Sequence, residues 1–123
     1  MDNAVRYFEV PVLDLDRAQA FYERVLQVTL ERQIVDGYDM ALFPWVEGGP
    51  GATGALARGD VYVPAKAGAL VYFTVVDIEQ AVHRAQAEGA RLLYAVKVVP
   101  GGRVAEVEDS EGNRMALFQV VEA

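Results

Sequence analysis

Residues 8–22 read FEVPVLDLDRAQAFY, and the spacing of the apolar residues changes within this stretch. From Phe8 to Val12 every second residue is apolar, with Glu9 on the opposite face, as in a strand that lies between two environments. After Asp14 the apolar residues recur at helical spacing, and this aspartate is a suitable N-cap. The stretch therefore predicts a strand followed by a helix whose apolar stripe covers a sheet.

The rest of the chain predicts the same order of elements twice. The first unit spans residues 5–58, and its strands are expected at 5–12, 28–35, 38–43 and 53–57. A linker at 58–68 leads to the second unit, residues 69–120, with strands expected at 69–75, 91–99, 103–108 and 114–120. Asp36-Gly37 suits a tight hairpin turn in the first unit, and Asp77 is a suitable cap for the second helix.

Two short matches support a duplication. Residues 14–18 match residues 77–81, and residues 54–56 match residues 115–117 in the corresponding strands. A repeated unit predicts pseudo-twofold symmetry. The predicted fold class is α+β, with two tandem β-α-β-β-β units in a single domain, residues 1–123, which is long enough to bury one core.

The composition excludes several classes of partner. The net charge is −7, whereas a nucleic-acid-binding protein needs a basic surface that displaces counterions from phosphates. No apolar run approaches the ~20 residues that a membrane span requires, and no signal-peptide pattern is present. The chain has no cysteine, so disulfides and thiolate metal sites are excluded. We expect a cytoplasmic protein without nucleic-acid or membrane partners.

Two signatures resemble the vicinal oxygen chelate superfamily, which includes glyoxalases, bleomycin-resistance proteins and extradiol dioxygenases. The first is the stretch 8–22, and the second is Asp109-Ser-Glu-Gly-Asn113 before the final strand, where the family often has proline in place of Ser110. The resemblance implies a cupped, half-open mixed sheet whose concave face holds a small organic molecule, often with Zn, Ni, Fe or Mn. It also implies a homodimer, since single-cup members commonly dimerise.

The positions at which the family carries metal ligands hold other residue types here. They are Tyr7 and Leu70 on the first strand of each unit, and Ala55 and Ala116 on the last strand. None of these side chains replaces an imidazole or carboxylate ligand, a tyrosinate at Tyr7 being the one conceivable exception. We therefore predict no metal and no other cofactor. The single histidine, His83, is expected on the exposed side of the second helix.

Alternation along the strands assigns a mostly apolar and aromatic set of side chains to the face opposite the helices, where a ligand would bind. The set comprises Tyr7, Glu9, Ala55, Ala57, Leu70, Tyr72, Thr74, Ala116 and Phe118. Glu9 is the candidate acid or base, with Tyr7 beside it, because desolvation among apolar residues would favour the protonated carboxyl group. The alternative for Glu9 is a salt bridge with Arg114 or another arginine.

Two aromatic residues, Phe43 and Trp45, lie next to the glycine-rich stretch 47–51. They are predicted either to form a lid that contacts the ligand or to make a hydrophobic contact across a dimer interface.

Three functions are compatible with the sequence. The first is a metal-independent protein that binds a small organic molecule in the cup, to sequester it or to convert it. The second is a metal-dependent lyase, isomerase or dioxygenase, in which carboxylates such as Glu9 and Glu106 form an unconventional site. The third is a non-catalytic dimeric interaction module whose cup is filled by its own side chains.

Overall fold

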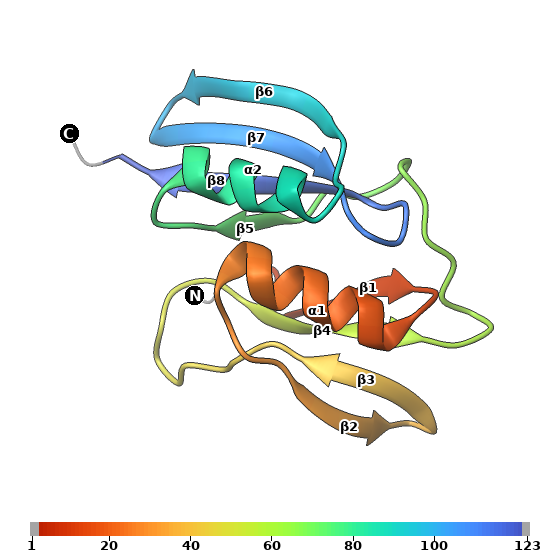
Figure 1. The fold of residues 1–123 in the computed structure, drawn as a ribbon. Helices are drawn as coiled ribbons and strands as arrows, with labels where there is room; N and C mark the ends of the chain where they lie inside the picture. The colour runs from red at the N-terminus through yellow and green to blue at the C-terminus, as the bar shows by residue number, and fades with distance from the viewer. Residues whose placement is uncertain (1–2, 122–123) are drawn as a thin grey trace.

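Figure 1 shows two copies of a β-α-β-β-β unit in the computed structural model, which describes residues 3–121. The first unit consists of β1 (Tyr7–Val12), α1 (Leu15–Leu26), β2 (Glu31–Val35), β3 (Tyr38–Leu42) and β4 (Thr53–Arg58). The second consists of β5 (Tyr72–Thr74), α2 (Ile78–Ala87), β6 (Leu92–Val99), β7 (Gly102–Glu108) and β8 (Arg114–Val120). The predicted α+β class and the repeated order of elements are confirmed.

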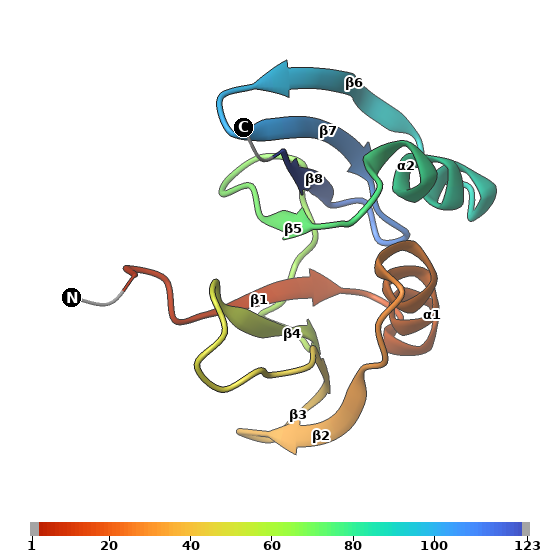
Figure 2. The same cartoon turned by 90° about the vertical axis from the view of Figure 1, so that its left-hand side faces the viewer.

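The strands form two four-stranded mixed sheets rather than one continuous sheet. Their orders are β1-β4-β3-β2 and β5-β8-β7-β6, with β1 and β5 each parallel to the last strand of its own unit. Within residues 3–121 no ladder joins β1 to β5, although Figure 2 shows them as neighbours in the middle of the molecule. Both helices lie on the same side of the sheets (Figure 2). The opposite face of each sheet is termed its cup face below.

Local sequence signals explain where the helices and the first hairpin begin. The carboxylates of Asp14 and Asp77 accept the main-chain N–H of the residue three positions later, as N-caps do. Asp36 and Gly37 have φ values of 52° and 80°, the conformation that a two-residue hairpin turn requires. Neither helix in the described part of the chain is long and apolar enough to cross a membrane.

Two strands are shorter than the sequence predicts by three residues or more. The strand β2 starts at Glu31 and not at residue 28, because Gln27 adopts a left-handed conformation and the next N–H still bonds back to Glu23 of the helix. The strand β5 covers only Tyr72–Thr74 and not residues 69–75. It is an edge strand that pairs only with β8, and the residues before it continue the linker and are not part of the sheet.

Both units contribute to one hydrophobic core between the helices and the sheets. At its centre are four aromatic rings whose neighbouring centroids lie 5.5 to 5.9 Å apart; they belong to Phe8, Tyr22, Phe43 and Phe73. Phe43 therefore lies in the core and does not form a lid over the cup as predicted. The reason is strand alternation: Leu42 faces the cup side, so the next side chain points toward the helices.

Glu111, in the β7–β8 turn, connects the second unit to the start of α1. Its Oε1 accepts the main-chain N–H groups of Leu13 and Asp14 at 2.9 and 2.8 Å, and its Oε2 accepts Nε of Arg17 at 2.7 Å. Burial acts to raise the pKa of Glu111, but these bonds and one from Ser110 outweigh it and lower the pKa from 4.5 to about 2.

Asp109 and Asn113, at the ends of the same turn, complete this connection. The hydroxyl of Tyr22 donates to Asp109 Oδ2 at 2.6 Å, and Asn113 Nδ2 donates to the same oxygen and to the carbonyl of Pro11. Asn113 Oδ1 accepts the N–H of Ala65 in the linker. The two signatures noted in the sequence are therefore partners in one buried hydrogen-bond network that joins the units.

Candidate functional site

The cup face of the first sheet is filled by the protein itself. Met40, Ala55 and Ala57 on this face are 0 to 1% exposed. They are covered by Tyr62, which reaches over from the linker and packs edge-on against the ring of Tyr38 with centroids 5.3 Å apart. A ligand on this half of the cup would have to displace Tyr62.

Glu9 lies on this cup face and bonds to two tyrosines. It accepts the hydroxyl of Tyr7 at 3.0 Å and that of Tyr62 at 2.7 Å. Burial and the bond to Glu9 raise the pKa of Tyr7 to about 12, and the bond to Glu9 followed by burial raises that of Tyr62 to about 12. Glu9 is exposed, so the desolvation expected from the sequence is not present. Its predicted alternative partner, Arg114, binds Glu106 instead.

The substitution Glu9→Gln is expected to lower the pKa of Tyr62 from about 12 toward its ordinary value of 10.0, because the hydrogen bond to the Glu9 carboxylate is the largest cause of the raised pKa. The pKa of Tyr7 should fall less, since burial is its largest cause. NMR signals of the tyrosine rings followed through an alkaline titration measure both values. Tyr38 is an internal control, because Asp60 and not Glu9 raises its pKa. An unchanged titration of Tyr62 would contradict this geometry.

The cup face of the second sheet is exposed at its two outer strands and buried between them. One row of residues crosses all four strands in register: Tyr72 on β5, Ala116 on β8, Glu106 on β7 and Tyr94 on β6. Tyr72 and Tyr94 are 49% and 39% exposed, whereas Glu106 is only 7% exposed. Arg114 Nε donates to Glu106 Oε1 at 2.6 Å. Phe118 is half-buried beside Tyr72, with centroids 6.5 Å apart.

The residues at the family's metal positions do not fit a metal ion. Ala55 and Ala116 are fully buried and have no donor atom, Leu70 is aliphatic, and the hydroxyl of Tyr7 already donates to Glu9. Among residues 3–121 no three His, Cys, Asp or Glu side chains form a group that could hold a metal ion. His83 is exposed on α2. Metal-free function stays a prediction.

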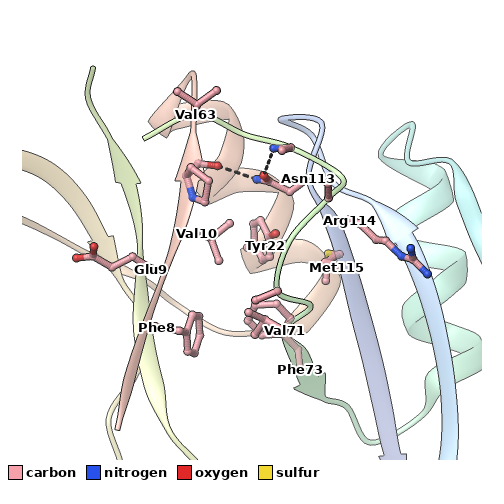
Figure 3. A pocket seen from close by; sticks show the side chains of 14 residues that line it. Phe8, Glu9, Val10, Tyr22, Val63, Val71, Phe73, Asn113, Arg114 and Met115 are labelled. Atoms are coloured by element: carbon pink, nitrogen blue, oxygen red, sulfur yellow. Dashed lines mark hydrogen bonds between the residues drawn. The ribbon is translucent and has the colours of Figure 1, made fainter. Parts of the chain in front are cut away.

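A cavity of about 310 Å³ lies between the two units, beneath the linker. It is termed the inter-unit pocket, and Figure 3 shows its lining. The side chains come from β1, α1, the linker, β5 and the start of β8, and they include Phe8, Val10, Tyr22, Val63, Val71, Phe73 and Met115. The side chain of Glu9 points away from these residues in Figure 3. The side chains of β1 that face the pocket are therefore its neighbours Phe8 and Val10.

Most polar side chains in the wall of the inter-unit pocket are already bonded within the protein. Both N–H groups of the Asn113 amide are donated, its oxygen accepts from Ala65, and the hydroxyl of Tyr22 is donated to Asp109. Burial and Asp109 keep the pKa of Tyr22 well above its ordinary value. A ligand would therefore be held mainly by apolar contact.

Part of this arrangement could not be found by alternation along strands. Tyr62 and the residues at 63–69 belong to the stretch predicted as a linker, yet they cover one half of the cup and line the pocket. The signal that could have found the pocket wall is the alternation of apolar residues from Val61 to Ala69, because Val63, Ala65, Ala67 and Ala69 all line the pocket. Trp45 is 55% exposed and lies beside Val5, away from both the pocket and the core.

Two tandem units with cup faces opposite their helices define a duplicated β-α-β-β-β protein. The sequence matches the Glyoxalase/Bleomycin resistance protein/Dioxygenase superfamily over residues 4–117. The chain therefore belongs to this superfamily, and the resemblance noted in the sequence is confirmed. No curated protein matches the chain.

Solved structures with the same fold come from several bacteria. A glyoxalase family protein from Bacillus cereus is 24% identical with a TM-score of 0.72, and covers 96% of this chain and 94% of its own. TnmS3, an antibiotic binding protein from Streptomyces sp. CB03234, is 23% identical with a TM-score of 0.65 and 98% of each chain covered. The fosfomycin resistance protein FosX from Listeria monocytogenes is 14% identical with a TM-score of 0.71, covering 98% and 93%. At these identities the likeness shows the fold alone.

Proposed function

We propose that this protein binds a small apolar or aromatic molecule in the inter-unit pocket without the metal ion that many members of the superfamily use. The observation that carries the proposal is the cavity of about 310 Å³, which is within the size range of small-molecule sites and is lined by aromatic and aliphatic side chains of both units. Sequestration of the ligand requires no catalytic group, which suits a pocket whose polar side chains are mostly engaged.

The relatives support a binding role. TnmS3 has the same fold and is an antibiotic binding protein, so this architecture accommodates an organic ligand in at least one relative. By extension, the ligand of the present chain is proposed to be a compound of comparable chemistry, large enough to contact β1, the linker and β5 together.

The metal-dependent alternative has less support. Glu9 is engaged by two tyrosines on the first sheet, whereas Glu106 is paired with Arg114 on the second, so the two carboxylates do not form a shared site. Elemental analysis of the purified protein separates the two functions. Stoichiometric Zn, Ni or Fe would favour the metal-dependent enzyme.

The substitution Ala69→Trp is expected to abolish binding in the inter-unit pocket. Ala69 is an exposed linker residue that lines the pocket, so an indole there occupies the cavity without disturbing the core. In a thermal-shift screen of aromatic compounds, a ligand at about 100 times its Kd adds about 2.7 kcal/mol to the stability of the native protein, roughly 10 °C in melting temperature. The variant should show no such rise.

The matched control is Ala52→Trp, which adds the same side chain to an exposed alanine that does not line the pocket. This control should respond to the ligand as the native protein does. Equal responses of both variants, or no response of the native protein to any compound of a broad aromatic library, would contradict the proposal.

We also propose a cytoplasmic homodimer, as the sequence predicts. Val5, Trp45 and Val46 form an exposed apolar area, with 60%, 55% and 69% of their surfaces accessible, and a second copy would bury it. Light scattering is expected to give twice the 13.4 kDa of one chain, and Trp45→Ser should shift the protein toward the monomer. A native protein that shows only the single-chain mass at micromolar concentration would refute the dimer.

A further inference from the structure

We propose that the ligand of the inter-unit pocket is an uncharged, peptide-like compound with an apolar side chain, which pairs with the main chain of Glu9 as a residue of an added strand does. The inference rests on the proposed function, because it names the class of molecule that the same pocket binds. It starts from the free edge of β1. Within residues 3–121 this strand pairs with β4 on one side and with no strand on the other.

The main-chain groups of Glu9 face this free edge. In a strand the N–H and C=O of one residue point to the same edge, and those of the next residue point to the opposite edge. The carbonyl of Pro11 points away from β4, because it accepts Nδ2 of Asn113 from across the gap at 2.7 Å. The groups of Glu9, two residues earlier, therefore point into the gap as well. Neither of them bonds to another group of the described chain.

Asn113 shows how an amide is held between this edge and the linker. Its Nδ2 donates to the carbonyl of Pro11, and its Oδ1 accepts the N–H of Ala65 at 3.0 Å, as the dashed lines in Figure 3 show. Two residues earlier along β1, at Glu9, the described chain supplies no such bridge, although Glu9 also lines the pocket. An amide of the ligand can take the position at Glu9 that the side chain of Asn113 takes at Pro11.

An extended peptide residue carries the pair of groups that Glu9 requires. Two opposite residues of an antiparallel pair exchange both hydrogen bonds, so Glu9 donates its N–H to a ligand carbonyl and accepts a ligand N–H. When a strand edge binds an extended segment, main-chain bonds give affinity and a side-chain pocket gives specificity. The side chain of Glu9 leaves this position open, because it points away from the pocket (Figure 3).

The rest of the pocket selects an uncharged ligand with an apolar side chain. An aromatic ring next to the paired amide would be buried among Phe8, Val71, Phe73 and Met115. The guanidinium of Arg114, which also contributes to the lining, is already paired with a carboxylate. A charged terminus would lose its hydration here without gaining a partner. The ligand is therefore a capped compound or the interior of a longer segment.

The probe is N-acetyl-L-phenylalanine N-methylamide, and the readout is two-dimensional amide NMR of the full chain. Without the probe, the N–H of Glu9 should exchange with deuterium about tenfold faster, or more, than those of Phe8 and Val10, which face β4. The probe should bind with a Kd of about 1 mM. At about ten times that Kd it should slow the exchange at Glu9 about tenfold, because exchange takes place from the unbound protein.

A matched analogue of the probe tests the bond to the carbonyl of Glu9. In this ester analogue an oxygen atom replaces the N–H of the phenylalanine residue, so the shape is kept and the donor is lost. It should bind about tenfold more weakly than the amide, or weaker still.

Two variants test the bond from the N–H of Glu9. Glu9→Pro removes this N–H, whereas Glu9→Ala removes the same side chain and keeps the N–H. Glu9→Pro should therefore bind the probe about tenfold more weakly than Glu9→Ala does. An edge position accepts proline, as Pro11 shows. If Glu9→Pro did not fold, the comparison of amide and ester on the native protein would still decide.

The substitution Ala69→Trp separates this inference from the proposed function, because it should abolish binding of the probe and of the aromatic compounds alike. Aromatic compounds that bind the native protein but not Ala69→Trp, together with equal affinities for amide and ester, would overturn the pairing with Glu9 and leave the proposed function in place. Binding of the probe without slower exchange at Glu9 would also overturn the pairing. Failure of the probe and of every aromatic compound to bind would overturn both.

Discussion

Glu111→Ala is expected to lower the free energy of unfolding by about 3 kcal/mol. The carboxylate has no exposed side-chain surface and accepts bonds from the main chain of Leu13 and Asp14 and from the guanidinium of Arg17. Its removal leaves two N–H groups at the start of α1 without their partner and disconnects the two units at this point. Urea denaturation of the variant and the native protein measures the difference.

The same residue makes stability depend on pH. The pKa of Glu111 is lowered from 4.5 in the unfolded chain to about 2 in the folded protein, so its contribution is fully present above pH 4.5. The contribution is lost as the pH falls from 4.5 through about 2, and it amounts to about 3 kcal/mol. The difference in unfolding free energy between the native protein and Glu111→Ala should therefore shrink over this range.

Glu79→Ala is the control for this experiment. Glu79 also pairs with an arginine, Arg103, but it is 68% exposed, so its removal should cost under about 1 kcal/mol. A loss for Glu111→Ala no greater than that of the control, or a difference from the native protein that is independent of pH, would show that the turn does not hold the units together in this way.

Asn113→Ala is expected to destabilise the protein by a similar amount, about 3 kcal/mol, for a different reason. The amide donates to Pro11 in the first unit and to Asp109 in its own turn, and it accepts from Ala65 in the linker. Alanine leaves the carbonyl of Pro11 and the N–H of Ala65 without these bonds. Thermal and urea denaturation give the size of the loss.

Two further variants separate the hydrogen bonds of Asn113 from its packing. Asn113→Asp keeps the shape but cannot donate to Pro11 and places a second carboxylate next to Asp109, so it should be no more stable than Asn113→Ala. Ser110→Ala removes one half-buried bond in the same turn, to Glu111, and should cost about 1 kcal/mol. Native-like stability of Asn113→Asp would contradict the assigned bonds.

The two carboxylates on the cup faces, Glu9 and Glu106, show which inferences from the sequence hold. Alternation along β1 placed Tyr7 and Glu9 on the face opposite the helices, and they lie there together. The same rule did not predict the environment of Glu9, because its exposure and the bond from Tyr62 depend on where the linker folds back over the sheet. From the sequence Glu106 was predicted only as a possible metal ligand. Its pairing with Arg114 could not be predicted, because it depends on the register of β7 and β8.

The sequence by itself determined the order and type of the secondary-structure elements, the helix caps, the hairpin at Asp36-Gly37 and the residue types at the family's metal positions. These features depend on residues that are close in the chain, where hydrophobic periodicity, capping and turn preferences act directly. Only the tertiary structure decided that the first half of the cup is filled, that Phe43 belongs to the core and that a cavity lies between the units. These features arise where segments far apart in sequence pack together, and the packing of Tyr62 over β3 and β4 or of the linker against Asn113 has no signature in either segment alone.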